Sequence, residues 1–123
     1  MSQQPVPTEI KLHQHSRMLE VSFDDGHHFE FSCEFLRVFS PSAEVRGHGV
    51  GQEVLQLDKQ QVNIARIEPV GQYAVKLCFD DGHDSGIYSW RYLHDIGLQQ
   101  AQLWQQYLQR LAAAGHPRQI SVE

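Results

Sequence analysis

Apolar and polar residues alternate with a period of two along much of this chain. Such alternation is typical of β-strands that bury one face and expose the other. A slip in the pattern occurs near Ala65-Arg66. The expected strands cover residues 9–15, 18–23, 61–69 and 73–79.

The apolar period changes towards the C-terminus. Over residues 98–115 the spacing becomes helical, and glutamines occupy most of the opposite face. Gly115, followed by Pro117, predicts the end of this helix. The expected apolar stripe consists of Leu98, Ala101, Trp104, Leu108 and Leu111.

A pentapeptide, Phe-Asp-Asp-Gly-His, occurs twice, at Phe23–His27 and at Phe79–His83. A three-residue loop in the first copy opposes Val21 to Phe29 and so keeps one face of the hairpin apolar. The same loop puts Gly26 at its left-handed position, which glycine adopts readily. The sequence therefore predicts two related β-hairpins.

The second hairpin is expected to be less regular than the first. The same loop there pairs Val75 with Ile87, but it also sets Leu77 opposite Ser85. The second copy contains one residue more than the first, so Ser85-Gly86 predicts a strand irregularity.

Short helices are expected after each hairpin. The stretch 33–39 carries apolar residues inward, and Ser40 with Pro41 predicts the start of a further helical turn, N-capped by Ser40. Ser89 predicts the N-cap of a helix that Gly97 ends. The glycine-rich stretch 46–56 is expected to be a surface loop, and residues 40–52 are a candidate functional region.

Together these patterns predict an α+β fold. Two related β-hairpin units form antiparallel sheet, and the C-terminal amphipathic helix packs on one face. We expect a flexible tail over residues 1–8, a single domain over 9–115 and a frayed tail over 116–123.

Composition narrows the function classes. The formal net charge of −5 and the scattered acidic residues argue against nucleic acid as a partner. Cys33 and Cys78 fall in expected strands, as buried thiols rather than a disulfide framework. No apolar leader and no run of 18 apolar residues is present, which predicts no membrane association and a cytoplasmic location.

Two groups of side chains could carry chemistry. Residues 80–84 place three carboxylates and an imidazole within five positions, which could bind a hard cation or act in acid–base catalysis. A tight hairpin turn explains the same residues, and the duplicate favours this reading. His13 and His15 lie on one strand face, where chelation and a solvated surface are alternatives.

Several stretches resemble a known family. They are similar to small bacterial proteins related to the N-terminal domain of gamma-butyrobetaine hydroxylase, over residues 8–114. In the hydroxylases a separate domain holds Fe(II) and 2-oxoglutarate, so the resemblance implies no hydroxylase activity here and no enzyme. The stretches that carry it are Leu36-Arg37, residues 40–48, 67–75 and 79–90, and Tyr92-Leu93.

The resemblance also implies a metal position. The hydroxylase domain holds zinc on three cysteines and one histidine, and the matching residues here are Ser40, Ser42, Val45 and His83. We therefore expect no cofactor. The alternative is a zinc or iron site that uses His83, with Glu44 or His48 as its partner.

A similar domain is also found at the C-terminus of some P-loop ATPases that handle iron–sulfur clusters, and this occurrence implies an accessory role. We expect a non-enzymatic protein-interaction module. The alternative is a metal-binding domain linked to iron–sulfur or 2-oxoglutarate-dependent systems. The exposed face of the sheet could pair two copies as a homodimer. The candidate interaction surface comprises Ser40, Ser42, Glu44, Arg46, His48, Tyr88 and Trp90, although the two aromatic residues could equally be core.

Overall fold

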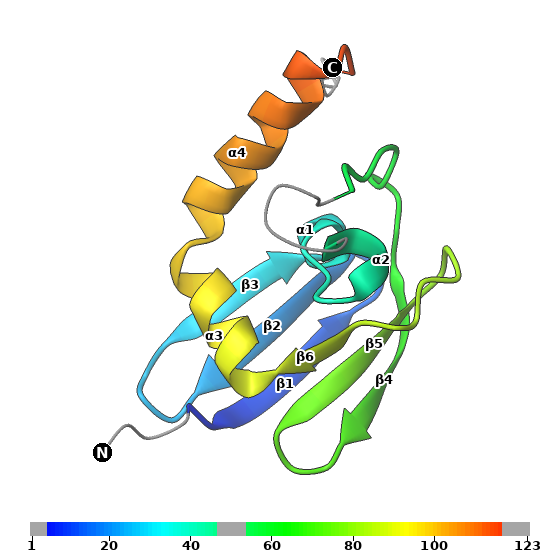
Figure 1. Cartoon of the computed structure of the whole chain (residues 1–123). Helices are drawn as coiled ribbons and strands as arrows, with labels where there is room; N and C mark the ends of the chain where they lie inside the picture. The colour runs from blue at the N-terminus through cyan, green and yellow to red at the C-terminus, as the bar shows by residue number, and fades with distance from the viewer. Residues whose placement is uncertain (1–4, 47–53, 117–123) are drawn as a thin grey trace.

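The computed structural model describes residues 5–46 and 54–116, and it shows two similar units in succession (Figure 1). The first unit comprises β1 (Pro7–His13), β2 (Met18–Phe23), β3 (His28–Ser32) and α1 (Cys33–Val38). The second comprises β4 (Ile64–Val70), β5 (Ala74–Phe79), β6 (Ile87–Ser89) and α3 (Trp90–Leu98). Two helices lie outside this repeat, α2 (Ala43–Arg46) and α4 (Gln100–Ala113).

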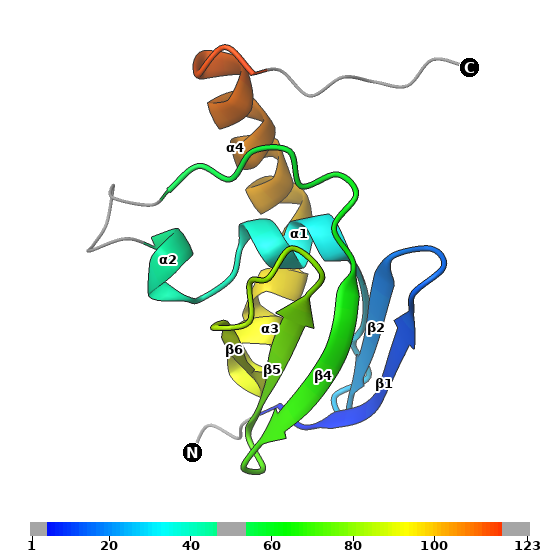
Figure 2. The same cartoon turned by 90° about the vertical axis from the view of Figure 1, so that its right-hand side faces the viewer.

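The predicted α+β class is confirmed. Each unit forms its own antiparallel three-stranded sheet, with strand orders β1-β2-β3 (Figure 1) and β4-β5-β6 (Figure 2). The repeat extends beyond the predicted hairpins into the helices. Ser32 caps α1 by accepting a hydrogen bond from the Phe35 N–H at 3.0 Å, and Ser89 caps α3 by accepting one from the Tyr92 N–H at 3.0 Å.

The first hairpin has the predicted register. Val21 opposes Phe29 and Leu19 opposes Phe31, so the apolar side chains share the buried face. Gly26 adopts a φ of +92°, which the three-residue loop requires.

The predicted register of the second hairpin is wrong by one residue. Val75 pairs with Tyr88, and Ile87 pairs with Lys76 instead. The expected irregularity at Ser85-Gly86 absorbs the extra residue, so that Tyr88 faces the core while Ile87 is exposed. Gly86 is needed there, because a Cβ at this position would lie 2.4 Å from Ser40 Oγ.

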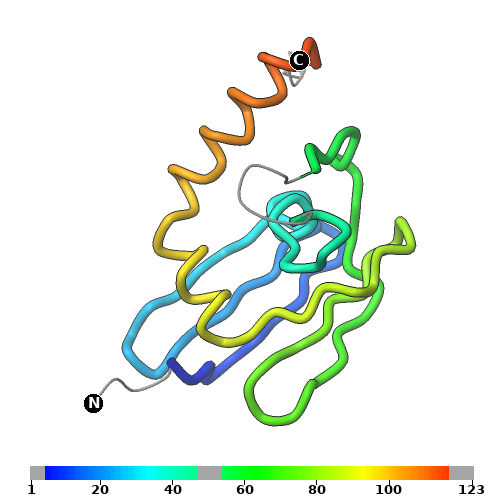
Figure 3. Tube along the Cα trace, in the orientation of Figure 1, coloured from blue at the N-terminus to red at the C-terminus, as the bar shows by residue number. Residues whose placement is uncertain are grey.

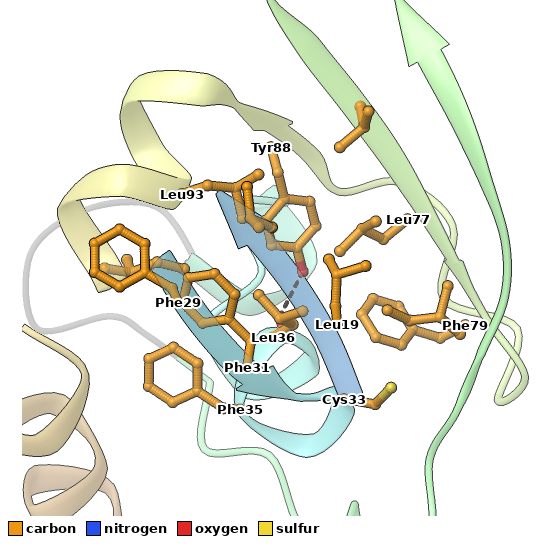
Figure 4. Close-up of a cluster of buried hydrophobic side chains, with 14 of the residues drawn as sticks. Leu19, Phe29, Phe31, Cys33, Phe35, Leu36, Leu77, Phe79, Tyr88 and Leu93 are labelled. Atoms are coloured by element: carbon orange, nitrogen blue, oxygen red, sulfur yellow. Dashed lines mark hydrogen bonds between the residues drawn. The ribbon is translucent and has the colours of Figure 1, made fainter. Parts of the chain in front are cut away.

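Both sheets and the helices α1 and α3 contribute to one apolar core (Figure 4). Tyr88 is fully buried, and its hydroxyl donates to the Leu36 carbonyl at the end of α1. Burial raises the pKa of Tyr88, which keeps the hydroxyl protonated as a donor. This bond joins the second unit to the first. The largest fully buried apolar side chains include Leu19, Phe31, Phe35, Leu36, Ile64, Leu77 and Leu93.

Two predicted helix boundaries are corrected. The side chain of Ser42 rather than Ser40 accepts the Glu44 N–H at 3.2 Å and caps α2, since Ser40 is buried and turned inward. Gly97 does not end α3 but lies inside it, where its lack of a side chain lets the helix approach the ring of Phe29.

The C-terminal helix also differs from the expected stripe. The chain bends at Gln99, between α3 and α4 (Figure 3), so Leu98 falls in α3 and is 56 % exposed. The rest of the expected stripe is confirmed in part, because Leu111 is buried and Trp104 and Leu108 are half-buried. Ala101 is exposed, and Tyr107, which the stripe did not include, packs against the end of α1. Gly115 ends the helix as predicted, with a φ of +81° and the His116 N–H donating to the Leu111 carbonyl at 2.8 Å. None of the helices in residues 5–46 and 54–116 has the length and apolar character needed to cross a membrane.

Replacing Gly97 with alanine should destabilise the fold. A Cβ at this position would lie 2.7 Å from atoms of the Phe29 ring, so ring and helix must move apart. We expect overpacking to lower the free energy of unfolding by about 1 to 3 kcal/mol, outweighing the usual helix gain of about 0.5–1 kcal/mol for this exchange. Urea denaturation measures the change. The control Gln102→Ala, on the exposed side of α4, should stay within about 0.5 kcal/mol of wild type.

Tyr88→Phe tests the bond between the two units. It keeps the ring but leaves the buried Leu36 carbonyl without its partner. We expect a loss of about 1–3 kcal/mol in the free energy of unfolding, the cost of an unsatisfied buried polar group. Tyr73→Phe, in a turn and 64 % exposed, is the matched control. Equal stability of the two variants would contradict a structural role for the Tyr88 hydroxyl.

Candidate functional site

A cluster of polar side chains, the His83 centre, lies at the turn of the second hairpin and consists of His83, Ser40 and Glu44. The imidazole is buried, and its Nε2 lies 2.9 Å from Ser40 Oγ. Its Nδ1 lies 3.1 Å from Glu44 Oε2 in α2. With Glu44 ionised, Nδ1 donates to the carboxylate and Nε2 accepts from the Ser40 hydroxyl, which describes a neutral imidazole.

Burial sets the charge state of His83. Loss of solvent, together with the nearby Arg37 guanidinium, lowers the pKa of His83 from its usual value of 6.5. The carboxylates of Glu44 and Asp81 act in the opposite direction without reversing this shift. The imidazole is therefore neutral at pH 7.

Ser40, His83 and Glu44 form a hydroxyl–imidazole–carboxylate chain, the arrangement that activates serine nucleophiles. However, Ser40 has no exposed surface, and its Oγ also accepts the Ser42 N–H at 3.2 Å. Gly86 also lies close to this oxygen, since a Cβ there would come within 2.4 Å of it. A substrate carbonyl has no room beside this oxygen, so the chain of hydrogen bonds acts to hold a buried imidazole in place.

These residues do not fit a zinc ion of the cysteine type. The resemblance implied four ligand positions at Ser40, Ser42, Val45 and His83, and the structure brings Ser40 and His83 into contact. The donors present are one imidazole and two neutral hydroxyls, and Ser42 Oγ is already bonded to Ser85 Oγ at 2.7 Å. Zinc in structural sites needs thiolate, imidazole or carboxylate ligands in a set of four.

The remaining metal prediction, His83 with Glu44 or His48, stays a prediction. The structure brings His83 and Glu44 together, and their contact is a hydrogen bond. His48 lies outside the described residues. His13 and His15 do not form a pair on one strand, because β1 ends at His13 and that imidazole contacts Glu20 instead.

The side chains of Arg37 and Lys59 neutralise the Asp81 carboxylate of the second turn. Partial burial raises the pKa of Asp81, but hydrogen bonds from Lys59, the His83 N–H and Arg37 outweigh it and bring the pKa to about 2. Arg37 Nε and Lys59 Nζ each lie 2.8 Å from the same oxygen, Asp81 Oδ2. This group is a structural ion cluster between α1 and the turn.

The predicted interaction surface divides in two. Ser40, Ser42 and Tyr88 are buried, so they cannot contact a partner; Tyr88 belongs to the core, the alternative that the sequence left open. Glu44 and Arg46 are exposed on α2. Trp90 is half-buried, and its Nε1 donates to the Gln72 carbonyl at 2.8 Å.

A groove that the sequence did not reveal lies among the helices. Its volume is about 570 Å³, and its lining comes from α1, α2, α3, α4 and the chain at Val54 and Gln56. Sequence patterns treat each element separately, so a hollow built from five segments leaves no periodic signal. The apolar lining includes Val38, Phe39, Val45, Val54, Tyr92, Ile96, Leu103 and Tyr107, and the polar lining includes Arg46, Gln56, Asp95, Gln99, Gln106 and Arg110.

The free energy of unfolding should decrease as the pH falls, partly because of His83. Its pKa is lower in the folded chain than in the unfolded chain, so below about pH 6.5 the unfolded chain takes up the proton first. We expect the free energy of unfolding of wild type to fall more between pH 7.5 and 5.5 than that of His83→Gln, measured by urea denaturation. Glutamine can keep hydrogen bonds to Ser40 and Glu44 but does not titrate. An equal or larger fall in the variant would contradict this.

Solved structures of similar proteins share the fold. Two proteins with NMR solution structures are 52 % and 45 % identical, with TM-scores of 0.78 and 0.81. The first match covers 100 % of this chain and 97 % of the other, and the second covers 98 % and 95 %. No curated protein matches the chain.

A crystal structure of a protein of unknown function from Acidithiobacillus ferrooxidans, of the DUF971 family, is 37 % identical. It has a TM-score of 0.62 and covers 74 % of this chain and 91 % of the other. The family model for the gamma-butyrobetaine hydroxylase-like N-terminal domain matches residues 10–94, which include both turns, α1, the start of α3 and the His83 centre. The chain therefore belongs to the gamma-butyrobetaine hydroxylase-like N-terminal family.

Proposed function

We propose that this chain is a non-enzymatic accessory module that binds a protein partner through the groove among its helices. The groove itself carries the proposal. Its lining combines apolar and aromatic side chains with charged and amide side chains, and Val54 is 51 % exposed. Apolar hollows with a polar rim are typical of surfaces that receive a helical or extended segment of another protein.

The charge of the groove indicates the kind of segment. Its lining carries two arginines, Arg46 and Arg110, against one acid, Asp95. The whole chain has a formal charge of −5, so the described lining of the groove is less acidic than the chain as a whole. The favoured occupant is a short amphipathic segment with apolar anchors and at least one carboxylate.

The His83 centre supports this function indirectly. Glu44 lies on α2 beside the groove residues Val45 and Arg46, and it is hydrogen bonded to the buried imidazole. The Tyr92 hydroxyl donates to the Phe39 carbonyl at 2.6 Å and ties α3 to the end of α1. These bonds hold elements that line the groove, which lowers the entropy cost of binding.

Selection of random peptides on phage against the immobilised full chain tests the proposal. We expect enriched peptides that combine apolar and acidic residues, and fluorescence polarisation of a labelled synthetic copy should give saturable binding. Val54→Glu and Arg46→Glu should each weaken that binding at least about tenfold, since they place a negative charge on the groove. Both residues are exposed, so the fold should survive.

The control is Tyr73→Glu, an equally drastic change at an exposed aromatic residue outside the groove. It should leave peptide affinity within about twofold of wild type, since rim-distant charges change affinity little. The proposal fails if no peptide is enriched. It also fails if both groove variants bind like wild type.

A further inference from the structure

The turn of the first hairpin and α3 bring three metal-binding side chains together. Asp25 Oδ2 lies 2.9 Å from His27 Nδ1 and 2.7 Å from His94 Nε2. Among the described residues, these three are the one set of at least three His, Cys, Asp or Glu side chains whose ligand atoms all lie within 4.8 Å of one another. Local patterns did not predict this group, because His94 is distant in the chain and the turn alone explained Asp25 and His27.

The surroundings hold these side chains in position. The ring of His94 makes edge contacts with Phe23 and Phe29, with centroids 5.0 and 5.7 Å apart, and its side chain is only 13 % exposed. His27 stacks on Phe29 at 5.5 Å. The His27 N–H donates to Asp25 Oδ1 at 3.0 Å, which leaves the other carboxylate oxygen facing both imidazoles. The ligand atoms are therefore pre-oriented.

The two copies of the turn differ in what balances their carboxylate. In the second copy, Asp81 is bound by Arg37 and Lys59, which are always charged. In the first copy, Asp25 is bound by two imidazoles, which carry positive charge only when protonated. A cation bound here would supply the charge that Arg37 and Lys59 supply in the second copy.

We propose that Asp25, His27 and His94 bind one divalent transition-metal ion of the Zn²⁺ class. Two imidazoles and a carboxylate are ligands that zinc accepts. Ligands about 2.0–2.1 Å from zinc in a tetrahedron lie about 3.3 Å apart, so the two oxygen–nitrogen separations need to open by only about half an ångström. Three protein ligands leave one position open. Asp25 and His27 are half-exposed, so this position faces solvent and can take water or a partner's side chain.

This site is separate from the groove and from the His83 centre. It joins the β2–β3 turn to α3, and it uses none of the residues that match the cysteine positions of the hydroxylase domain. The metal would act as a cross-link between two elements of the first and second units. It would therefore stabilise the folded chain as well as bind to it.

Isothermal titration of the metal-free full chain with Zn²⁺ at pH 7.5 tests the proposal. We expect one saturable 1:1 event and a higher melting temperature in its presence. His27→Gln, His94→Gln and Asp25→Asn should each weaken binding at least about tenfold. Asparagine keeps the oxygen that caps the turn but loses the charge. His27 and Asp25 are exposed enough that these two variants should fold even if His94→Gln does not.

The matched control is His28→Gln. This residue is also an exposed imidazole of the same hairpin; its Nε2 lies 3.1 Å from Glu20, whose other oxygen contacts His13. Its Zn²⁺ affinity should stay within about twofold of wild type, because its ring contacts Ser22 and Glu20 and none of the three ligand side chains. The proposal is overturned if Zn²⁺ does not bind at 1:1. It is equally overturned if binding survives both His27→Gln and Asp25→Asn, or if the control loses affinity as they do.

Discussion

The three-residue turn with its glycine is the constraint from which the rest of the fold follows. In each copy an aspartate oxygen accepts the histidine N–H two residues later, at 3.0 Å for Asp25 and 3.1 Å for Asp81. The glycines between them, Gly26 and Gly82, have φ values of +92° and +90°. Because side chains alternate along a strand, a turn one residue longer or shorter would reverse the faces of the hairpin. Burial of the apolar face depends on this geometry.

The repeated Phe-Asp-Asp-Gly-His motif has different roles in its two copies because the surrounding residues differ. His27 remains half-exposed near His94, whereas His83 turns inward between Ser40 and Glu44. Asp25 has imidazole partners, and Asp81 has Arg37 and Lys59. The backbone hydrogen bonds of the motif are therefore structural in both copies. The side chains beyond them are free to acquire separate roles, provided the turn itself is kept.

Much of the fold could be predicted from the sequence, since strand period, turn glycines and serine caps are local signals. The register of the first hairpin followed from apolar pairing alone. The second register failed because Gly86 accommodates Ser40, a contact between distant segments that no local pattern encodes. The break between the last two helices was predicted at Gly97 and lies slightly later, at Gln99, since Gly97 packs on Phe29 inside α3.

The candidate sites were harder to predict for the same physical reason. The family resemblance left Glu44 and His48 open as partners of His83, and the structure shows the contact with Glu44. The burial of Ser40 and Ser42 was not predicted, because their exposure depends on residues of the second unit. The meander order of both sheets also has a kinetic consequence. Every strand pairs with its sequence neighbour, so each unit can close from its own turn quickly and without the other. The slow step of folding should be the docking of the two units, when the Tyr88 hydroxyl meets α1 and Asp81 meets Arg37.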